Sequence, residues 1–135
     1  MKKSVCCLLI ISMVFIVSAC SGNSGENEIA KAINEEEIKE ITATTRMTVE
    51  PQKITLDESE WSDLLDKFNS YSLKKLNVEE SGGGWDYYFR IVQNDDSVIS
   101  VSFSHSDSIG GIVYINDDMY KVENYDSEDF SYLFE

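Results

Sequence analysis

The chain has 135 residues, with 11 lysines and arginines against 25 aspartates and glutamates, and its formal net charge at pH 7 is −14. This acidity argues against nucleic acid as a partner, because affinity for nucleic acid comes from neutralising phosphates with basic side chains. It also argues against a domain that lies flat on anionic lipid, and the length suits one small domain.

Residues 1–19 have the pattern of a secretory signal peptide. Lys2 and Lys3 form a basic start, residues 5–17 are apolar except for Ser12, and small residues follow. The apolar run is short for a permanent membrane span, which needs about 20 residues. We therefore expect this segment to direct export and then to be removed.

The end of that segment, Val17-Ser18-Ala19-Cys20, resembles the lipobox of bacterial lipoproteins. The resemblance implies a diacylglyceryl group on the Cys20 sulfur and cleavage between Ala19 and Cys20. Two acyl chains anchor a protein stably, whereas one chain holds it only marginally. The expected location is the extracytoplasmic face of the cell membrane. An ordinary signal peptide that ends beside a cysteine is the alternative.

The remaining cysteines, Cys6 and Cys7, lie inside the apolar run and would leave with the signal peptide. Because Cys20 would carry the lipid, no thiol remains for a disulfide or a thiolate metal site. We expect a mature domain that is held by its hydrophobic core and needs no cofactor.

Residues 20–37 are predicted to form a flexible tether. Residues 21–25 are typical of a coil, and an acidic stretch follows. A short helical turn is also compatible with the apolar residues in this stretch, which leaves the inner end of the tether open: Ile29, Ala30, Ala32 and Ile33. A single globular domain is expected over residues 38–135.

Two strands are predicted at the start of this domain. Apolar residues alternate from Ile41 to Val49, which indicates a half-buried strand, and Pro51 ends it because proline cannot donate to a ladder. Ile54 and Leu56 predict a short second strand that returns along the first.

A helix is predicted over residues 57–70. Asp57 and Glu60 have the spacing of a capping box. A single apolar stripe follows at helical spacing: Trp61, Leu64, Leu65 and Phe68. Between a ligand-stacking platform and a core anchor, we interpret Trp61 as a core anchor.

Strand patterns separated by turn residues fill most of the remaining chain: Leu76 with Val78, 85–92, 99–103, 112–115 and 119–122. Short connections between neighbouring strands predict an antiparallel meander. Asp126 or Ser127 is expected to cap a short C-terminal helix that carries Phe130, Leu133 and Phe134. The predicted fold class is α+β: an antiparallel sheet of about five to seven strands, one packed helix and a short C-terminal helix. The serine-rich face of residues 98–104 should be solvated.

No catalytic motif is convincing. His105 is flanked by Ser104, Ser106 and Asp107, but neighbours on a strand point to opposite faces, so we expect an exposed histidine without a catalytic role.

Two short motifs are also rejected. Ser72-Leu73-Lys74-Lys75 matches the S-x-x-K pattern of penicillin-binding enzymes, but the companion motifs of that family are absent. Gly82-Gly83-Gly84 is interpreted as a turn, because a phosphate loop needs a helix or a lysine behind it and an aromatic strand follows here.

Acidic turns raise the question of Ca²⁺, which prefers six to eight oxygen ligands. The candidates are Asn94-Asp95-Asp96, Asp107, Asn116-Asp117-Asp118 and residues 124–129. None has the spacing of a dedicated calcium loop, so solvated turns and no metal site are expected, with weak calcium binding left open.

Aromatic side chains are the other candidates for binding a peptide or a sugar: Trp85, Tyr87, Tyr88, Phe89, Tyr114, Tyr120 and Tyr125. Half of any such run on a strand must face the core.

From about Ile38 to Phe134, the pattern resembles small uncharacterised lipoprotein domains of Firmicutes. The similar features are a strand, the helix "LDESEWSDLLDKFNSY", a glycine before aromatic strands, and the return "INDDMYKV". The resemblance implies a non-enzymatic accessory domain and carries no ligand to this chain. The leading hypothesis is a lipid-anchored binding module that contacts a protein or cell-envelope partner through a strand edge or an aromatic patch. The alternative is a small cell-envelope enzyme or an enzyme inhibitor.

Overall fold

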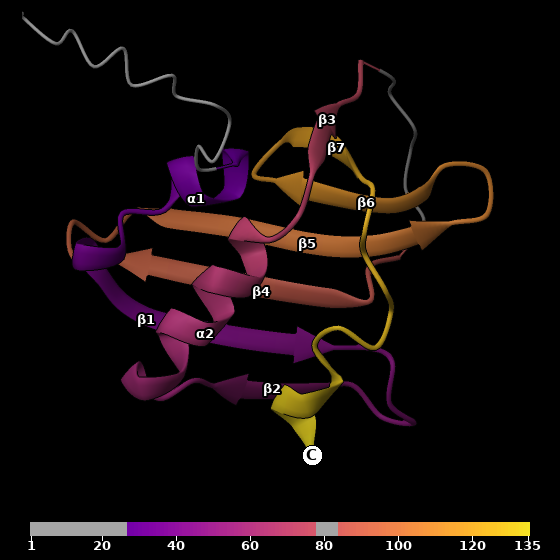
Figure 1. Ribbon diagram of the computed structural model, residues 1–135. Helices are drawn as coiled ribbons and strands as arrows, with labels where there is room; N and C mark the ends of the chain where they lie inside the picture. Colours follow the sequence, from indigo (N-terminus) through magenta and orange to yellow (C-terminus); the bar gives the residue numbers. More distant parts are fainter. Residues whose placement is uncertain (1–26, 78–83) are drawn as a thin grey trace, which may run out of the picture.

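The computed structural model describes residues 27–77 and 84–135; the predicted signal peptide with Ala19, the predicted lipidation residue Cys20, Val78 and Gly82-Gly83 lie outside this part. In the described part, seven strands form one antiparallel sheet in the order β2-β1-β4-β5-β6-β7-β3 (Figure 1). The strands are β1 (Ile38–Thr45), β2 (Gln52–Thr55), β3 (Leu73–Lys75), β4 (Tyr87–Gln93), β5 (Val98–Ser106), β6 (Gly110–Ile115) and β7 (Asp118–Val122). The predicted α+β class is confirmed.

The helices lie on one face of this sheet, which we call the inner face (Figure 1). They are α1 (Glu28–Ala32), α2 (Glu58–Asn69) and the short 3-10 helices η1 (Glu35–Glu37) and η2 (Ser131–Phe134). Helix α2 connects the edge strand β2 to β3 at the opposite edge, and therefore crosses the inner face. None of the described helices is long and apolar enough to cross a membrane.

The predicted helix is confirmed as α2, which starts where the capping pattern indicates. The Asp57 amide donates to Glu60 Oε2 at 2.8 Å. Leu64 and Phe68 are fully buried, and Trp61 packs against the same core, as expected of a core anchor. The indole nitrogen of Trp61 finds no hydrogen-bond acceptor among the described residues.

The core of the inner face is built largely from aromatic rings. Phe130 is fully buried, and its ring centroid lies 4.9 Å from that of Phe89 and 5.0 Å from that of Phe103. The C-terminal segment that carries Phe130 is also held by polar contacts. Lys67 Nζ lies 2.8 Å from Asp129 Oδ1, and the Tyr71 hydroxyl donates to Asp129 Oδ2 at 2.9 Å. Burial alone would raise the pKa of Asp129, but these hydrogen bonds outweigh it and hold the pKa below its ordinary value.

Residues 27–37, which the sequence placed in the flexible tether, are folded onto the domain. Ile29 is fully buried and Ile33 nearly so, because α1 and the turn after it press them into the core. Asn27 organises this contact. Its Oδ1 accepts the amides of Ile29 and Ala30 at 3.1 Å each, which caps α1. The fold therefore reaches back to Asn27, and α1 coincides with the short helical turn that the sequence left open within the predicted tether.

The Asn27 side chain also joins α1 to the end of α2. Its Nδ2 donates to the carbonyls of Phe68 at 2.6 Å and Tyr71 at 3.0 Å. These carbonyls belong to the last turn of α2 and the residues after it, where helical partners are missing. One side chain thus satisfies backbone groups of two helices that are far apart in the sequence.

We expect Asn27→Ala to lower the free energy of unfolding by about 2 kcal/mol, since the cap is lost and two carbonyls lose their partner. Asn34→Ala is the matched control, because Asn34 is exposed and its side chain caps no helix. Urea unfolding of both variants checks the expectation. Equal midpoints for the two variants would show that the Asn27 contacts contribute nothing.

Two strand predictions are corrected. β1 starts at Ile38 and ends at Thr45, so Met47 and Val49 are exposed instead of continuing the alternation. The chain turns there because the Thr45 hydroxyl accepts the Met47 amide at 3.0 Å. The strand expected at Leu76 lies instead at residues 73–75, where it pairs with β7.

The expected C-terminal helix exists, but it is the short 3-10 helix η2, which follows Phe130. Asp126 caps a preceding turn: its Oδ1 accepts the Glu128 amide at 2.9 Å.

Candidate binding surface

The opposite face of the sheet, which we call the outer face, carries no helix of the described part of the chain (Figure 1). The register of the strands defines the residues on this face, since alternate residues point to opposite sides. From β2 to β3 they are Lys53, Thr55, Glu40, Thr42, Thr44, Tyr88, Arg90, Val92, Val98, Ser100, Ser102, Ser104, Ser106, Gly110, Ile112, Tyr114, Met119, Lys121 and Lys74.

The centre of the outer face is rich in hydroxyl groups. Four residues lie opposite one another on neighbouring strands and form a row across the sheet: Thr44, Tyr88, Ser102 and Tyr114. The Tyr88 and Ser100 hydroxyls lie 3.0 Å apart and hydrogen-bond. Ser100 and Ser102 are partly exposed, whereas Ser104 is 9 % exposed, so the predicted solvation of the serine face holds only for part of it.

An aromatic and cationic cluster adjoins this row: Arg46 and Trp85 lie beside Tyr88, which belongs to the row. The Arg46 guanidinium carbon lies 4.3 Å from the centroid of the Trp85 ring, and the Trp85 and Tyr88 ring centroids are 5.7 Å apart. A cation over an aromatic face contributes about 0.5–1 kcal/mol at an exposed site. The three side chains therefore hold one another in place on a partly exposed surface.

The aromatic run divides between the two faces. Tyr87 and Phe89 point into the core, and burial raises the pKa of Tyr87 to about 12. Tyr125 also packs on the inner side, with its hydroxyl donating to Asp86 Oδ2 at 3.0 Å. Trp85 precedes β4, which begins at Tyr87, and its ring contacts that of Tyr88 instead of joining the core.

The outer face is basic although the whole chain is acidic. Its strands contribute four basic residues, Lys53, Arg90, Lys121 and Lys74, and Arg46 adds a fifth at the cluster. Two carboxylates partly balance them: Glu40 lies 3.9 Å from Arg90, and Glu123 lies 3.7 Å from Lys121. An excess of positive charge remains on this face, while the chain as a whole carries −14.

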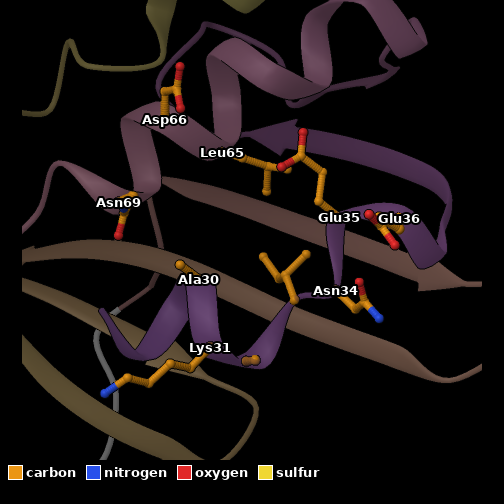
Figure 2. A pocket seen from close by; sticks show the side chains of 10 residues that line it. Ala30, Lys31, Asn34, Glu35, Glu36, Leu65, Asp66 and Asn69 are labelled. Atoms are coloured by element: carbon orange, nitrogen blue, oxygen red, sulfur yellow. The ribbon is translucent and has the colours of Figure 1, made fainter. Parts of the chain in front are cut away.

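A cleft of about 540 Å³ lies between α1, η1 and α2, and Figure 2 shows the side chains that line it. Its apolar wall includes Ile33 and Leu65, and the charged side chains around it do not converge, since Lys31 and Asp66 point away from one another (Figure 2). A smaller cavity of about 250 Å³ lies between the β1–β2 loop and the C-terminal segment. Neither cavity is lined by His105.

The residues considered for catalysis are not assembled. His105 is exposed at the end of β5, opposite Gly111. Within the described residues, Ser106 hydrogen-bonds to Ser108 and not to the imidazole. In the S-x-x-K segment, the backbone amide of Ser72 donates to Asn124 Oδ1 at 3.1 Å.

Side chains of the acidic turns make hydrogen bonds and an ion pair within the domain. Asp95 Oδ1 accepts the Ser97 amide at 2.9 Å, and Asp96 pairs with Lys39 at 2.9 Å. Asn116, which has a φ of 52° as its turn requires, accepts the Ser100 amide at 3.0 Å. Across residues 27–77 and 84–135, no group of three or more potential metal ligands is found.

No family model matches the chain, and neither a curated protein nor a solved structure is similar enough to count as a match. The functional inference therefore starts from the outer face. Sequence reasoning missed this surface because the basic residues are spread over four strands. Each strand shows its polar positions in the sequence, but only the pairing of the strands reveals that the basic residues among them share one face of the sheet.

Proposed function

We propose that this protein is a lipid-anchored, non-catalytic binding module on the extracytoplasmic side of the membrane, and that it contacts its partner with the outer face. The observation that supports the proposal is the cluster of Arg46, Trp85 and Tyr88 beside the hydroxyl row. Trp, Tyr and Arg dominate the binding energy of interfaces because they bury a large area in fixed geometry. Their mutual contacts hold them in place before a partner arrives, which reduces the entropy cost of binding.

The strand edges are less suited to contact. β2 and β3 are short, and both carry lysines that discourage the addition of another strand: Lys53, Lys74 and Lys75. The outer face therefore fits the proposal better than either edge.

The proposed anchor would keep the domain close to the bilayer. An extended chain reaches at most about 3.6 Å per residue, so the segment from Cys20 to Asn27 spans no more than about 25 Å. Such a span places the outer face within reach of partners at the membrane surface and in the adjacent envelope.

Photocrosslinking in intact cells tests the contact surface. We expect a photoreactive residue at Ser102, in the centre of the outer face, to form an adduct with the partner. The same residue at Ser62, which is exposed on α2, should form little or none. Equal adducts from both positions would contradict the outer face as the contact surface.

A further inference from the structure

We propose that the partner of the outer face is an extended anionic polymer whose repeating units carry hydroxyl groups; this inference rests on the proposed function. Its first support is charge complementarity. A chain of net charge −14 repels anions over most of its surface, yet five basic residues gather on or beside one face of the sheet. An anionic partner is therefore attracted to this face and repelled elsewhere, which orients the encounter.

The distribution of the basic residues favours a long ligand over a small one. Lys53 lies on one edge strand, Arg90 lies on β4, and Lys74 lies on the other edge strand. With strands about 4.8 Å apart, six spacings separate the edges by about 29 Å. A small anion can meet only one of these charges, whereas a polymer laid across the strands meets them in turn.

The surface between these charges provides contacts for hydroxyl-bearing repeats. The row of Thr44, Tyr88, Ser102 and Tyr114 crosses four strands between the two edges, and each of these side chains has a hydroxyl group that both donates and accepts. An acidic polypeptide would use the basic residues but offers few hydroxyl groups to this row. A membrane surface would meet the basic residues as well, but Val98 is the one large aliphatic side chain of this face that is exposed among the described residues, which is too little apolar surface for insertion.

The partly exposed aromatic rings of the cluster also suit a polymer whose repeating units carry hydroxyl groups. Tyr88, which belongs to the row, and Trp85 beside it add aromatic surface on which the carbon–hydrogen faces of a polyol or sugar can pack. The cluster would therefore hold one stretch of the polymer closely, and the distant lysines would contribute longer-range attraction.

Titration calorimetry with poly(glycerol phosphate) tests the proposal. The protein used is residues 20–135, which includes all described residues and lacks the leader, with the substitution Cys20→Ser. We expect binding at about 0.01 M ionic strength, where the Debye length is about 30 Å, and clear weakening at about 0.15 M. Neutral dextran should not bind. The double variant Lys53→Glu with Lys121→Glu should weaken the affinity at least tenfold.

Lys31→Glu with Lys75→Glu is the matched control, because it changes the net charge equally, while Lys31 lies on α1 and Lys75 alternates with Lys74 to the opposite side of β3. Its affinity should stay within about twofold of the wild type, as expected when local and not overall charge decides. An equal loss in both double variants would overturn the proposal. Poly-L-glutamate that binds as tightly as poly(glycerol phosphate) would also overturn it, since the hydroxyl row would then contribute nothing. An absence of binding to poly(glycerol phosphate) would refute the polymer, while crosslinking from Ser102 would still support a binding module with a different partner.

Discussion

Replacement of Phe130 by alanine is expected to lower the free energy of unfolding by about 3–5 kcal/mol, the range for removing a buried phenylalanine. The Phe130 side chain is fully buried, and its ring contacts those of Phe68, Phe89 and Phe103 within 6 Å. It is the residue through which the C-terminal segment closes the core over the inner face. A small domain has about 5–15 kcal/mol of stability, so the loss is a large fraction of the total.

Urea unfolding measures this loss, and Tyr132→Ala is the matched control. Tyr132 belongs to the same segment but is 49 % exposed, so its replacement should cost far less. Similar midpoints for the two variants would contradict the role of Phe130, because they would show that the segment is attached to the sheet without contributing to the core.

Cys20→Ala is expected to abolish acylation and to leave the leader uncleaved by the lipoprotein peptidase. The reason is chemical: the proposed lipid would be attached through a thioether, and alanine has no sulfur to form one. Labelling of cells with an alkyne-bearing fatty acid, followed by membrane fractionation, measures both the lipid and the location. Labelled wild-type protein should remain with membranes after a salt wash, because acyl chains and not charge hold it.

Cys7→Ala provides the control for this experiment, since Cys7 lies inside the apolar run and is expected to leave with the leader. Its labelling should match that of the wild type. Fatty-acid labelling that persists in Cys20→Ala would show that another residue carries the lipid or that the resemblance to a lipobox is misleading.

Local patterns in the sequence predicted most of the sheet and its packed helix. Asp57 and Glu60 marked the start of α2 because a capping box involves residues only three apart. The strands from Tyr87 to Val122 were visible because their inward residues alternate and the turns between them are short.

Contacts between distant residues could not be predicted in this way. Asn27 joins α1 to carbonyls more than forty positions away, so its neighbours looked like a tether. The short strand β3 exists because it pairs with β7, and no pattern within its three residues reveals that partner.

The candidate binding surface also depends on residues that are distant in the sequence, so local patterns did not predict it. The composition indicates an acidic protein, and acidity suggested that anionic surfaces would be repelled. The register instead collects Lys53, Arg90 and Lys121 on one face, although they are widely separated in the chain. Arg46 and Trp85 meet only because β1 and β4 are neighbours in the sheet.

The central claim is that the outer face of the sheet is the binding surface. Photocrosslinking from Ser102 in intact cells tests it most directly when it is combined with Trp85→Ser, a change at a partly exposed ring that leaves the core intact. We predict an adduct from Ser102 in the otherwise unchanged protein and a strong reduction of that adduct with Trp85→Ser. An adduct that forms equally well with and without the Trp85 ring, and equally well from Ser62, would contradict the account.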